Sequence, residues 1–271
     1  MKPQDRRTGV VRSAVGADEP RDHASPLGMR ALVVLPSYNE SQNIVDLVGA
    51  LLDANSEYSI CVVDDASPDG TSELLAQAIE GAPGWRGRVC LITRDKKDGR
   101  GGAVRDGFAW GLAHDPPFGA FAEMDCDFSH EPGAVPRGFD LVAQGCDVVI
   151  GARYPDGTII GWPRRRRIFS FLANQLARRL IDPSIDDYTT GFRFYSPRAV
   201  RVLVGQPQRY KGYIYLSESL AYLLREDLRI TSFPILFRNR ERGVSNTGLR
   251  EIGSALRGIF AIAWVYRRSR T

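Results

Sequence analysis

Short, uninterrupted apolar runs alternate along this chain with longer segments whose apolar residues recur at helical spacing. The first run, 31–36 (ALVVLP), is typical of a strand buried on both faces. The next segment, 37–54, repeats its apolar residues at helical spacing from Ile44 on. That pattern predicts a helix, with Asn39 or Ser41 as its N-cap.

The alternation continues as far as Arg153. Further strands are predicted at 58–65, 88–93, 119–125 and 146–153, and helices at 71–82 and from the glycine-rich loop 96–103 to residue 112. Strands that alternate with helices favour right-handed crossovers. The fold class predicted is therefore α/β, with a Rossmann-like, mainly parallel sheet flanked by helices.

The pattern changes after Arg153. A helix is predicted at 161–181, with Pro163 in its first turn, followed by a helix at 213–227 and a strand at 229–237. A terminal amphipathic helix, 249–271, either packs on the domain or lies in a membrane interface. The tail 1–28 has few large apolar residues and is expected to be disordered, which leaves 29–248 as the folded domain.

Composition narrows the classes of protein. The chain has 271 residues, is 43% hydrophobic and carries a net charge of +4, as a globular protein with a sizeable core does. So mild a positive charge predicts no nucleic-acid partner. No run reaches the roughly 18–20 apolar residues of a membrane span, and the N-terminus lacks the apolar segment of a secretory signal. The four cysteines form no CxxC pair and are expected to be reduced thiols.

Acidic residues gather where predicted strands end. Asp64 and Asp65 close the second strand, and Glu123, Asp125 and Asp127 fall within five positions around the end of the fourth. The carboxyl ends of parallel strands share one edge of a sheet, where ligands bind. Residues two apart on an extended chain project the same way, so Asp125 and Asp127 can face one Mg²⁺ or Mn²⁺ ion. Such an ion can bridge a diphosphate.

Two common nucleotide signatures are missing. The loop 96–103 (KKDGRGGA) lacks the third glycine of a dinucleotide fingerprint, and no G-x-x-x-x-G-K-[ST] loop occurs. Basic residues instead open the helix at 161–181. Arg166, Ser170 and Asn174 share one helix face, where an arginine above a hydroxyl is a candidate phosphate clamp. The alternative for these arginines is a solvated basic face.

From Ala31 to Gly248 the chain resembles the polyprenol (dolichyl) phosphate mannose synthases of glycosyltransferase family 2, which have the GT-A fold. The segments that carry the resemblance are LPSYNE (35–40), VVDDASPDGT (62–71), KKDGRGGA (96–103), MDCDFSHEP (124–132), GARY (151–154), GWPRRRRIFSFLAN (161–174), DYTTGFRFY (187–195), KGYIYLSE (211–218) and FPILFRNRERGVS (233–245).

The resemblance implies roles for individual residues. On the donor side, the nucleoside pocket would be formed by Pro36, Tyr38, Glu40 and Asp65. Asp125 and Asp127 would bind the metal ion and the diphosphate, over which Arg240 would close. On the acceptor side, Arg153, Arg166 and Ser170 would grip the lipid phosphate. At Asn246 the chain departs from the lysine usual in the family, which puts the identity of the donor in doubt.

The reaction implied is an inverting displacement in which a polyprenyl phosphate attacks a nucleotide sugar, foremost GDP-mannose. Because a phosphate anion needs no strong base, Asp187 is expected to orient an arginine such as Arg193 or to cap a turn; its alternative role is general base. The expected location is cytoplasmic and peripheral, at the inner membrane face, with or without a separate membrane-anchoring subunit.

Three alternatives stay open. Another family 2 enzyme could use UDP-glucose or a hydroxyl acceptor, and would then depend on Asp187 rather than Arg166. A sugar nucleotidyltransferase also uses acidic metal sites in an α/β fold. A sugar-nucleotide-binding protein without activity would show no turnover.

Overall fold

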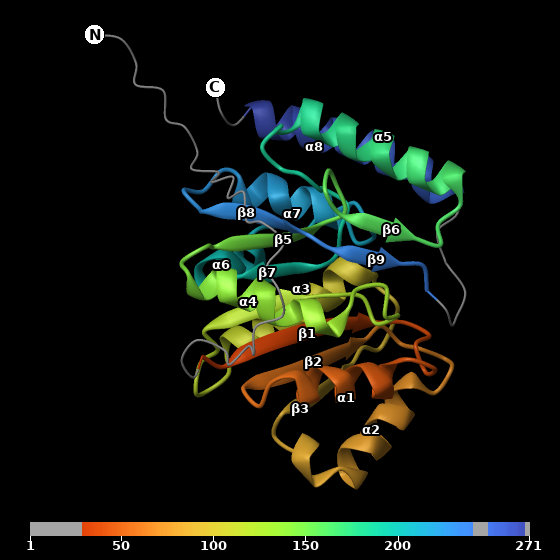
Figure 1. The fold of residues 1–271 in the computed structure, drawn as a ribbon, viewed down its shortest axis with the longest axis vertical. Coiled ribbons are helices and arrows are strands. Elements are labelled where there is room, and N and C mark those ends of the chain that lie inside the picture. Colours follow the sequence, from red (N-terminus) through yellow and green to blue (C-terminus); the bar gives the residue numbers. More distant parts are fainter. Residues whose placement is uncertain (1–28, 241–248, 269–271) are drawn as a thin grey trace.

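A computed structural model describes residues 29–240 and 249–268, and the side chains of the last helix from Gly258 on. Figure 1 shows a twisted sheet with helices on both faces and a pair of helices packed along one end. The tail 1–28, expected to be disordered, and Asn246 lie outside the described residues.

Seven strands form the main sheet, and its mainly parallel character is confirmed. Only β7 runs antiparallel to its neighbours, β4 and β5; the other pairs are parallel. In spatial order the strands are β3 (Val89–Thr93), β2 (Tyr58–Asp64), β1 (Ala31–Ser37), β4 (Ala120–Glu123), β7 (Arg193–Tyr195), β5 (Val148–Ala152) and β8 (Ile230–Pro234).

Helices cover both faces of this sheet, which explains the continuous apolar runs. On β1, Leu32 and Val34 pack into one core, and Val33 and Leu35 into the other. The helices are α1 (Ile44–Ala54), α2 (Thr71–Gly81), α3 (Arg100–Leu112), α4 (Val135–Ala143), α5 (Arg164–Leu180), α6 (Pro197–Gly205), α7 (Tyr215–Leu223) and α8 (Leu249–Arg268), with short 3₁₀ turns η1 (Pro83–Trp85) and η2 (Pro132–Ala134).

The predicted caps of the first helix are wrong. α1 begins at Ile44, after Asn43. The backbone N–H groups of Asn39 and Ser41 donate instead to Ser67 Oγ at 2.9 Å and Asp69 Oδ2 at 3.1 Å. The segment after β1 is therefore bound to the turn after β2 and cannot yet be helical.

Two predicted strands are shorter than expected. The strand at 119–125 ends at Glu123, so Asp125 and Asp127 lie in the loop after β4 and not on extended chain. The strand at 229–237 divides after Pro234: β8 continues the main sheet, and β9 (Leu236–Arg238) pairs with β6 (Thr158–Ile160) in a separate two-stranded sheet. A proline that cannot donate to a ladder suits such a division.

Over the described ranges 29–240 and 249–268, no helix has the length and apolar character needed to cross a bilayer. The four cysteines are free thiols, and Cys126 Sγ–H donates to Pro36 O at 3.4 Å.

Candidate active site

The strand order brings the acidic segments together. β2 and β4 are both parallel neighbours of β1, so their carboxyl ends meet at one edge of the sheet. Asp64 and Asp65 end β2, and the loop with Asp125 and Asp127 follows β4. The topology therefore supports the expectation that both acidic pairs share one edge.

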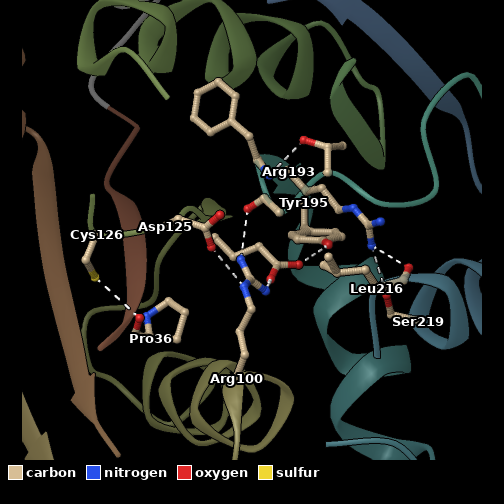
Figure 2. Close-up of polar contacts among 12 residues, drawn as sticks. Pro36, Arg100, Asp125, Cys126, Arg193, Tyr195, Leu216 and Ser219 are labelled. Atoms are coloured by element: carbon tan, nitrogen blue, oxygen red, sulfur yellow. Dashed lines mark hydrogen bonds and ion pairs between the residues drawn. The ribbon is translucent and has the colours of Figure 1, made fainter. Parts of the chain in front are cut away.

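Each acid of the cluster after β4 contacts an arginine. Glu123 is fully buried and accepts hydrogen bonds from Arg100 Nη1 and, at 2.7 Å, from Tyr195 Oη. Asp125 Oδ1 accepts from Arg100 Nε at 3.0 Å (Figure 2). Asp127 Oδ2 lies 3.0 Å from Arg240 Nη2. The like charges packed into this stretch are thus compensated by two guanidinium groups.

Asp125 and Asp127 are suited to hold a divalent cation with help from other ligands. Their side chains are 25% and 7% exposed, and Asp125 Oδ2 has no partner among the described residues. Within that part of the chain no group of three or more metal-ligating side chains occurs. Mg²⁺ and Mn²⁺ tolerate one or two carboxylates when phosphate oxygens and water complete the shell. The pair therefore fits a metal bound together with a diphosphate.

Burial and charge act differently on two acids of this edge. Burial alone would raise the pKa of Asp125, but the nearby charges, chiefly Arg100, hold the pKa of that carboxyl below its usual value. Burial raises the pKa of Glu40 to about 7, and its hydrogen bond from Asn43 Nδ2, at 2.8 Å, offsets only part of the shift. Arg240 Nη1 is 4.0 Å from Glu40.

The residues predicted to form the nucleoside pocket differ in their surroundings. Pro36 lies in β1, and Lys97 Nζ sits 3.4 Å from the centre of the Tyr38 ring. Asp65 is already engaged: its carboxylate accepts from Arg94 Nη1 at 2.7 Å and from the backbone N–H groups of Asp98 and Gly99 at 2.8 and 2.7 Å. Asp65 therefore shapes the loop before α3, and its predicted contact with base or ribose stays a prediction.

On the acceptor side, Asp187 binds Arg153 and not Arg193. Arg153 Nε and Nη2 donate to the Asp187 carboxylate at 2.9 and 3.0 Å, and both side chains are almost fully buried. Arg193, the expected partner, instead donates to backbone carbonyls of Leu216 and Tyr188 and to Ser219 Oγ. β7 carries Arg193 into the core beneath α7, away from Asp187.

Asp187 also caps its own turn, as the sequence suggested. Its Oδ1 accepts from the backbone N–H of Thr189 at 2.9 Å, and Thr189 Oγ1 accepts from Arg153 Nη2 at 2.6 Å. With Arg153 and Thr189 on both of its oxygens, Asp187 is poorly placed to take a proton from a substrate.

Arg166 extends from α5 to Asn239, the residue before Arg240. Burial lowers the pKa of Arg166, and the charges of Arg240 and Arg153 lower it further, while Tyr213 and Asp127 oppose the shift. These side chains are therefore within electrostatic reach of one another. Arg166 Nη1 donates to Asn239 Oδ1 at 3.3 Å, and its guanidinium lies 4.2 Å from the centre of the Trp162 ring. Ser170 follows one turn later on α5, half-buried.

Asn174, grouped with these two in the sequence, has a structural role. It is fully buried, donates to Asp186 O at 2.6 Å and accepts from the backbone N–H of Tyr188 at 2.9 Å. It therefore anchors the loop that presents Asp187. Beside Asp127, a cleft of about 340 Å³ opens between α1, η2 and β9, lined by Asn43, Asp46, Phe128, Glu131, Pro132, Arg238 and Asn239.

Sequence reasoning gave no role to Arg100, although its loop was singled out. One signal was available: Glu123 ends a fully apolar strand, and a carboxylate buried there requires a cation. Nothing in the sequence said which of the many arginines supplies it.

Solved structures share this architecture. Structures of glucosyl-3-phosphoglycerate synthase from Mycobacterium tuberculosis, one in complex with Mn²⁺, UDP and phosphoglyceric acid and another with Mn²⁺, UDP-glucose and phosphoglyceric acid, match with TM-scores of 0.65 and 0.62 at 19% and 18% identity. Both matches cover 90% of this chain, and 80% and 81% of those chains. The chain therefore has the GT-A fold.

Sequence comparison defines the family. A model of glycosyl transferase family 2 matches residues 32–204. Polyprenol monophosphomannose synthase from Mycolicibacterium smegmatis is 36% identical, covering 84% of each chain. Undecaprenyl-phosphate mannosyltransferase from Micrococcus luteus is 34% identical, covering 84% of this chain and 91% of its own. The chain belongs to glycosyl transferase family 2, which rules against the nucleotidyltransferase alternative.

Proposed function

We propose that the protein transfers mannose from GDP-mannose to a polyprenyl phosphate at the cytoplasmic face of the membrane. One observation carries the proposal: the guanidinium groups of Arg153 and Arg166 lie 5.6 and 4.2 Å from the centre of the same ring, that of Trp162. Arg166 also donates to Asn239, the neighbour of Arg240, and Arg240 Nη2 is 3.0 Å from Asp127. An anionic donor and an anionic acceptor both need cationic partners there. The names of the two mannosyl-transferring relatives support this choice of sugar and acceptor.

The donor lies on the carboxylate side in this proposal. A Mg²⁺ or Mn²⁺ ion held by Asp125 and Asp127 would neutralise charge on the departing diphosphate. Arg240, 3.0 Å from Asp127, supplies a second positive charge beside the same group. Pro36, Tyr38, Glu40 and Asp65 surround the nucleoside in the proposed pose.

The acceptor phosphate binds Arg153, Arg166 and Ser170. Its oxygen attacks the anomeric carbon, and the nucleoside diphosphate leaves from the opposite face, so the configuration inverts. A phosphate oxygen is already anionic near neutral pH, so positioning and charge compensation suffice. Asp187 takes no proton in this scheme; it holds the Arg153 guanidinium in place through two hydrogen bonds.

A membrane surface is the proposed location of the acceptor. α5 and α8 lie side by side at one end of the molecule (Figure 1). Apolar side chains on both helices face solvent, among them Ile168 at 60% and Trp264 at 63% exposure, with Phe171, Leu172 and Phe260. Exposed arginines flank them at Arg164, Arg165, Arg167, Arg267 and Arg268. Apolar groups rimmed by cations suit an anionic bilayer surface.

A second candidate keeps the acceptor but changes the donor to UDP-glucose. The structural neighbours that bind UDP-glucose support it, as does Asn246, where the family's usual lysine is missing. Incubation with labelled GDP-mannose or UDP-glucose, a polyprenyl phosphate and Mg²⁺ or Mn²⁺ separates the two. Label that enters the organic phase from GDP-mannose, and stays aqueous with EDTA, supports the proposal. Label from UDP-glucose alone selects the second candidate, and label that stays aqueous with both donors overturns both.

The membrane surface has its own test. Sedimentation with vesicles of anionic lipid is expected to retain the wild type and to lose a Phe260→Ser/Trp264→Ser variant, because apolar insertion contributes to binding. Leu74→Ser, which also replaces an exposed apolar side chain but on α2, serves as the control. Equal sedimentation of all three proteins would contradict the proposed surface.

A further inference from the structure

Arg100 occupies the centre of a buried polar network at the acidic edge (Figure 2). It is the first residue of α3, and its side chain is 10% exposed. Each nitrogen of the guanidinium has a different acceptor. Nε donates to Asp125 Oδ1 at 3.0 Å, Nη1 to Glu123 Oε2, and Nη2 to the backbone carbonyl of Gly191 at 3.0 Å. The planar fork is thereby fixed in position and in orientation.

Neighbouring atoms leave the guanidinium group of Arg100 no room to move. A Cβ at Gly191 would lie 2.5 Å from Arg100 Nη2 and 3.0 Å from Cζ. Glu123, on the other side, is fixed by Tyr195 Oη at 2.7 Å. Gly101 faces Tyr215, the first residue of α7, at a distance too short for any side chain, so the start of α3 is packed against the start of α7. Arg100 is therefore a rigid support and not a mobile surface cation.

Arg100 binds only one of the two carboxylate oxygens of Asp125. Arg100 occupies Asp125 Oδ1, and within the described residues Oδ2 has no protein partner. Asp125 lies in a loop, where neither a helix nor a strand fixes its side chain. The Arg100 contact consequently decides which oxygen of Asp125 is presented to the cleft.

We propose that Arg100 is a positioning residue of the divalent-cation site, which orients Asp125 so that Oδ2 alone is offered to the ion. The inference rests on the metal site in the proposed function and not on the identity of the sugar or of the acceptor. Groups that orient metal ligands are worth about 10–100-fold in metal affinity.

Arg100 also carries a positive charge, which by itself would weaken the binding of a metal ion, whereas its positioning of Asp125 would strengthen it. If the arginine acted only as a nearby cation, it would repel the metal ion, and its removal would tighten binding. If it orients Asp125, its removal weakens binding. The sign of the change in metal affinity therefore distinguishes positioning from simple charge repulsion.

The experiment measures Mn²⁺ binding to the full chain by electron paramagnetic resonance of the free ion, with GDP or UDP at one fixed concentration and no acceptor. A sample without protein gives the Mn²⁺ that the nucleotide binds alone. Arg100→Met is expected to weaken Mn²⁺ binding about tenfold or more. Arg105→Met is the matched control. Arg105 lies on the same helix, but its guanidinium donates to the backbone carbonyls of Val204 and Gln206, at 2.6 Å each, and not to an acid of the site. Its Mn²⁺ affinity should equal that of the wild type.

A second variant guards against misfolding, because Arg100→Met leaves the buried Glu123 without its cation. Gly191→Ala changes no charge but pushes the guanidinium away from its seat. We expect it to weaken Mn²⁺ binding in the same direction while circular dichroism stays that of the wild type. Unchanged or tighter binding in both variants would overturn the proposal.

Failure of this inference differs from failure of the proposed function. A wild type that transfers mannose to lipid but binds no Mn²⁺ overturns the role of Arg100 and leaves the acceptor proposal intact. A wild type that binds Mn²⁺ but transfers no sugar to lipid overturns the proposed function and leaves the role of Arg100 intact.

Discussion

Arg100 and Arg153 are both buried and each forms an ion pair with a carboxylate, Asp125 and Asp187 respectively, yet the proposed site uses the two pairs in opposite ways. On the donor side the arginine is the support, since Arg100 orients Asp125. On the acceptor side the acid is the support, because Asp187 holds Arg153 by two side-chain hydrogen bonds. In the proposed site, the same kind of ion pair thus presents a carboxylate to a cation on one side and a guanidinium to an anion on the other.

This contrast shows why each charged group that faces the ligand needs a buried partner of opposite charge. A charge in a partly dry cleft binds a ligand well only when its orientation is already fixed. The supporting partner also offsets part of the desolvation cost of the charge. Four substitutions test the contrast, in order of decreasing effect.

Removing the charge of Asp127 should have the largest effect on sugar transfer. Asp127→Asn keeps the shape of the side chain but removes the charge that faces the metal ion and Arg240. Loss of several kcal/mol of charge stabilisation corresponds to about a thousandfold lower transfer. The measurement is labelled sugar in the organic phase, with thermal denaturation to verify the fold. Activity within tenfold of the wild type would mean that this carboxylate does not act on the donor.

Removing the supporting acid should act first on stability. Asp187→Ala leaves Arg153 buried without its partner, which costs about 3–5 kcal/mol and lowers the melting temperature by roughly 10 °C. Asp186→Asn is the control, since Asp186 is partly exposed and its ion pair with Arg178 spans 3.5 Å. A melting temperature unchanged in Asp187→Ala, with transfer abolished, would identify Asp187 as a base and favour a hydroxyl acceptor.

Glu40 is compensated more weakly than Asp125 or Asp127, since Arg240 Nη1 lies 4.0 Å from its carboxylate. Its pKa, about 7 in the folded protein, exceeds the usual 4.5, so the native state binds more protons than the unfolded state between these values. The free energy of unfolding should therefore fall by about 3 kcal/mol as pH rises from 4.5 to 7. Urea denaturation in EDTA should show this decline in the wild type, and Glu40→Gln should lack it. The same slope in both proteins would contradict the raised pKa.

Arg166 has the weakest support of the acceptor arginines and should give the smallest change. It has one hydrogen bond of 3.3 Å and the Trp162 ring, so its loss removes about one charged contact with the phosphate. Arg166→Ala is expected to raise KM for the lipid phosphate about tenfold, or ~1.4 kcal/mol, with little change in melting temperature. Arg201→Ala, which removes an exposed arginine from α6, should leave KM unchanged. Equal KM values for both variants would remove Arg166 from the acceptor site.

Much of the fold follows from periodicity. The double-sided burial of β1 and β2 makes their sequences continuously apolar, and the alternation of strand and helix predicts the parallel sheet. Three residues of β7 are too few to show a period, so an antiparallel strand in the middle of the sheet was not foreseen. The end of β4 was misplaced for a related reason, since Met124 and Cys126 are buried like strand residues although they lie in a loop.

The location of the site could be predicted from the sequence, but the pairing of its arginines with its acids could not. The acids Asp125 and Asp127 were found because strand order brings the carboxyl ends together. Which arginine meets which acid depends on side chains far apart in the sequence: Arg153 and Asp187 are 34 positions apart, and Arg100 and Glu123 are 23 apart. No local pattern distinguishes Arg153 from Arg193 as the partner of Asp187.

The reversed direction of β7 has a mechanical consequence. Because this strand begins at the ligand-binding edge, the residues just ahead of it arrive there too. Asp187 grips Arg153, and four positions later the carbonyl of Gly191 grips Arg100. One short stretch of backbone thus fixes the positions of both arginines, and deleting a single residue from it would displace both at once.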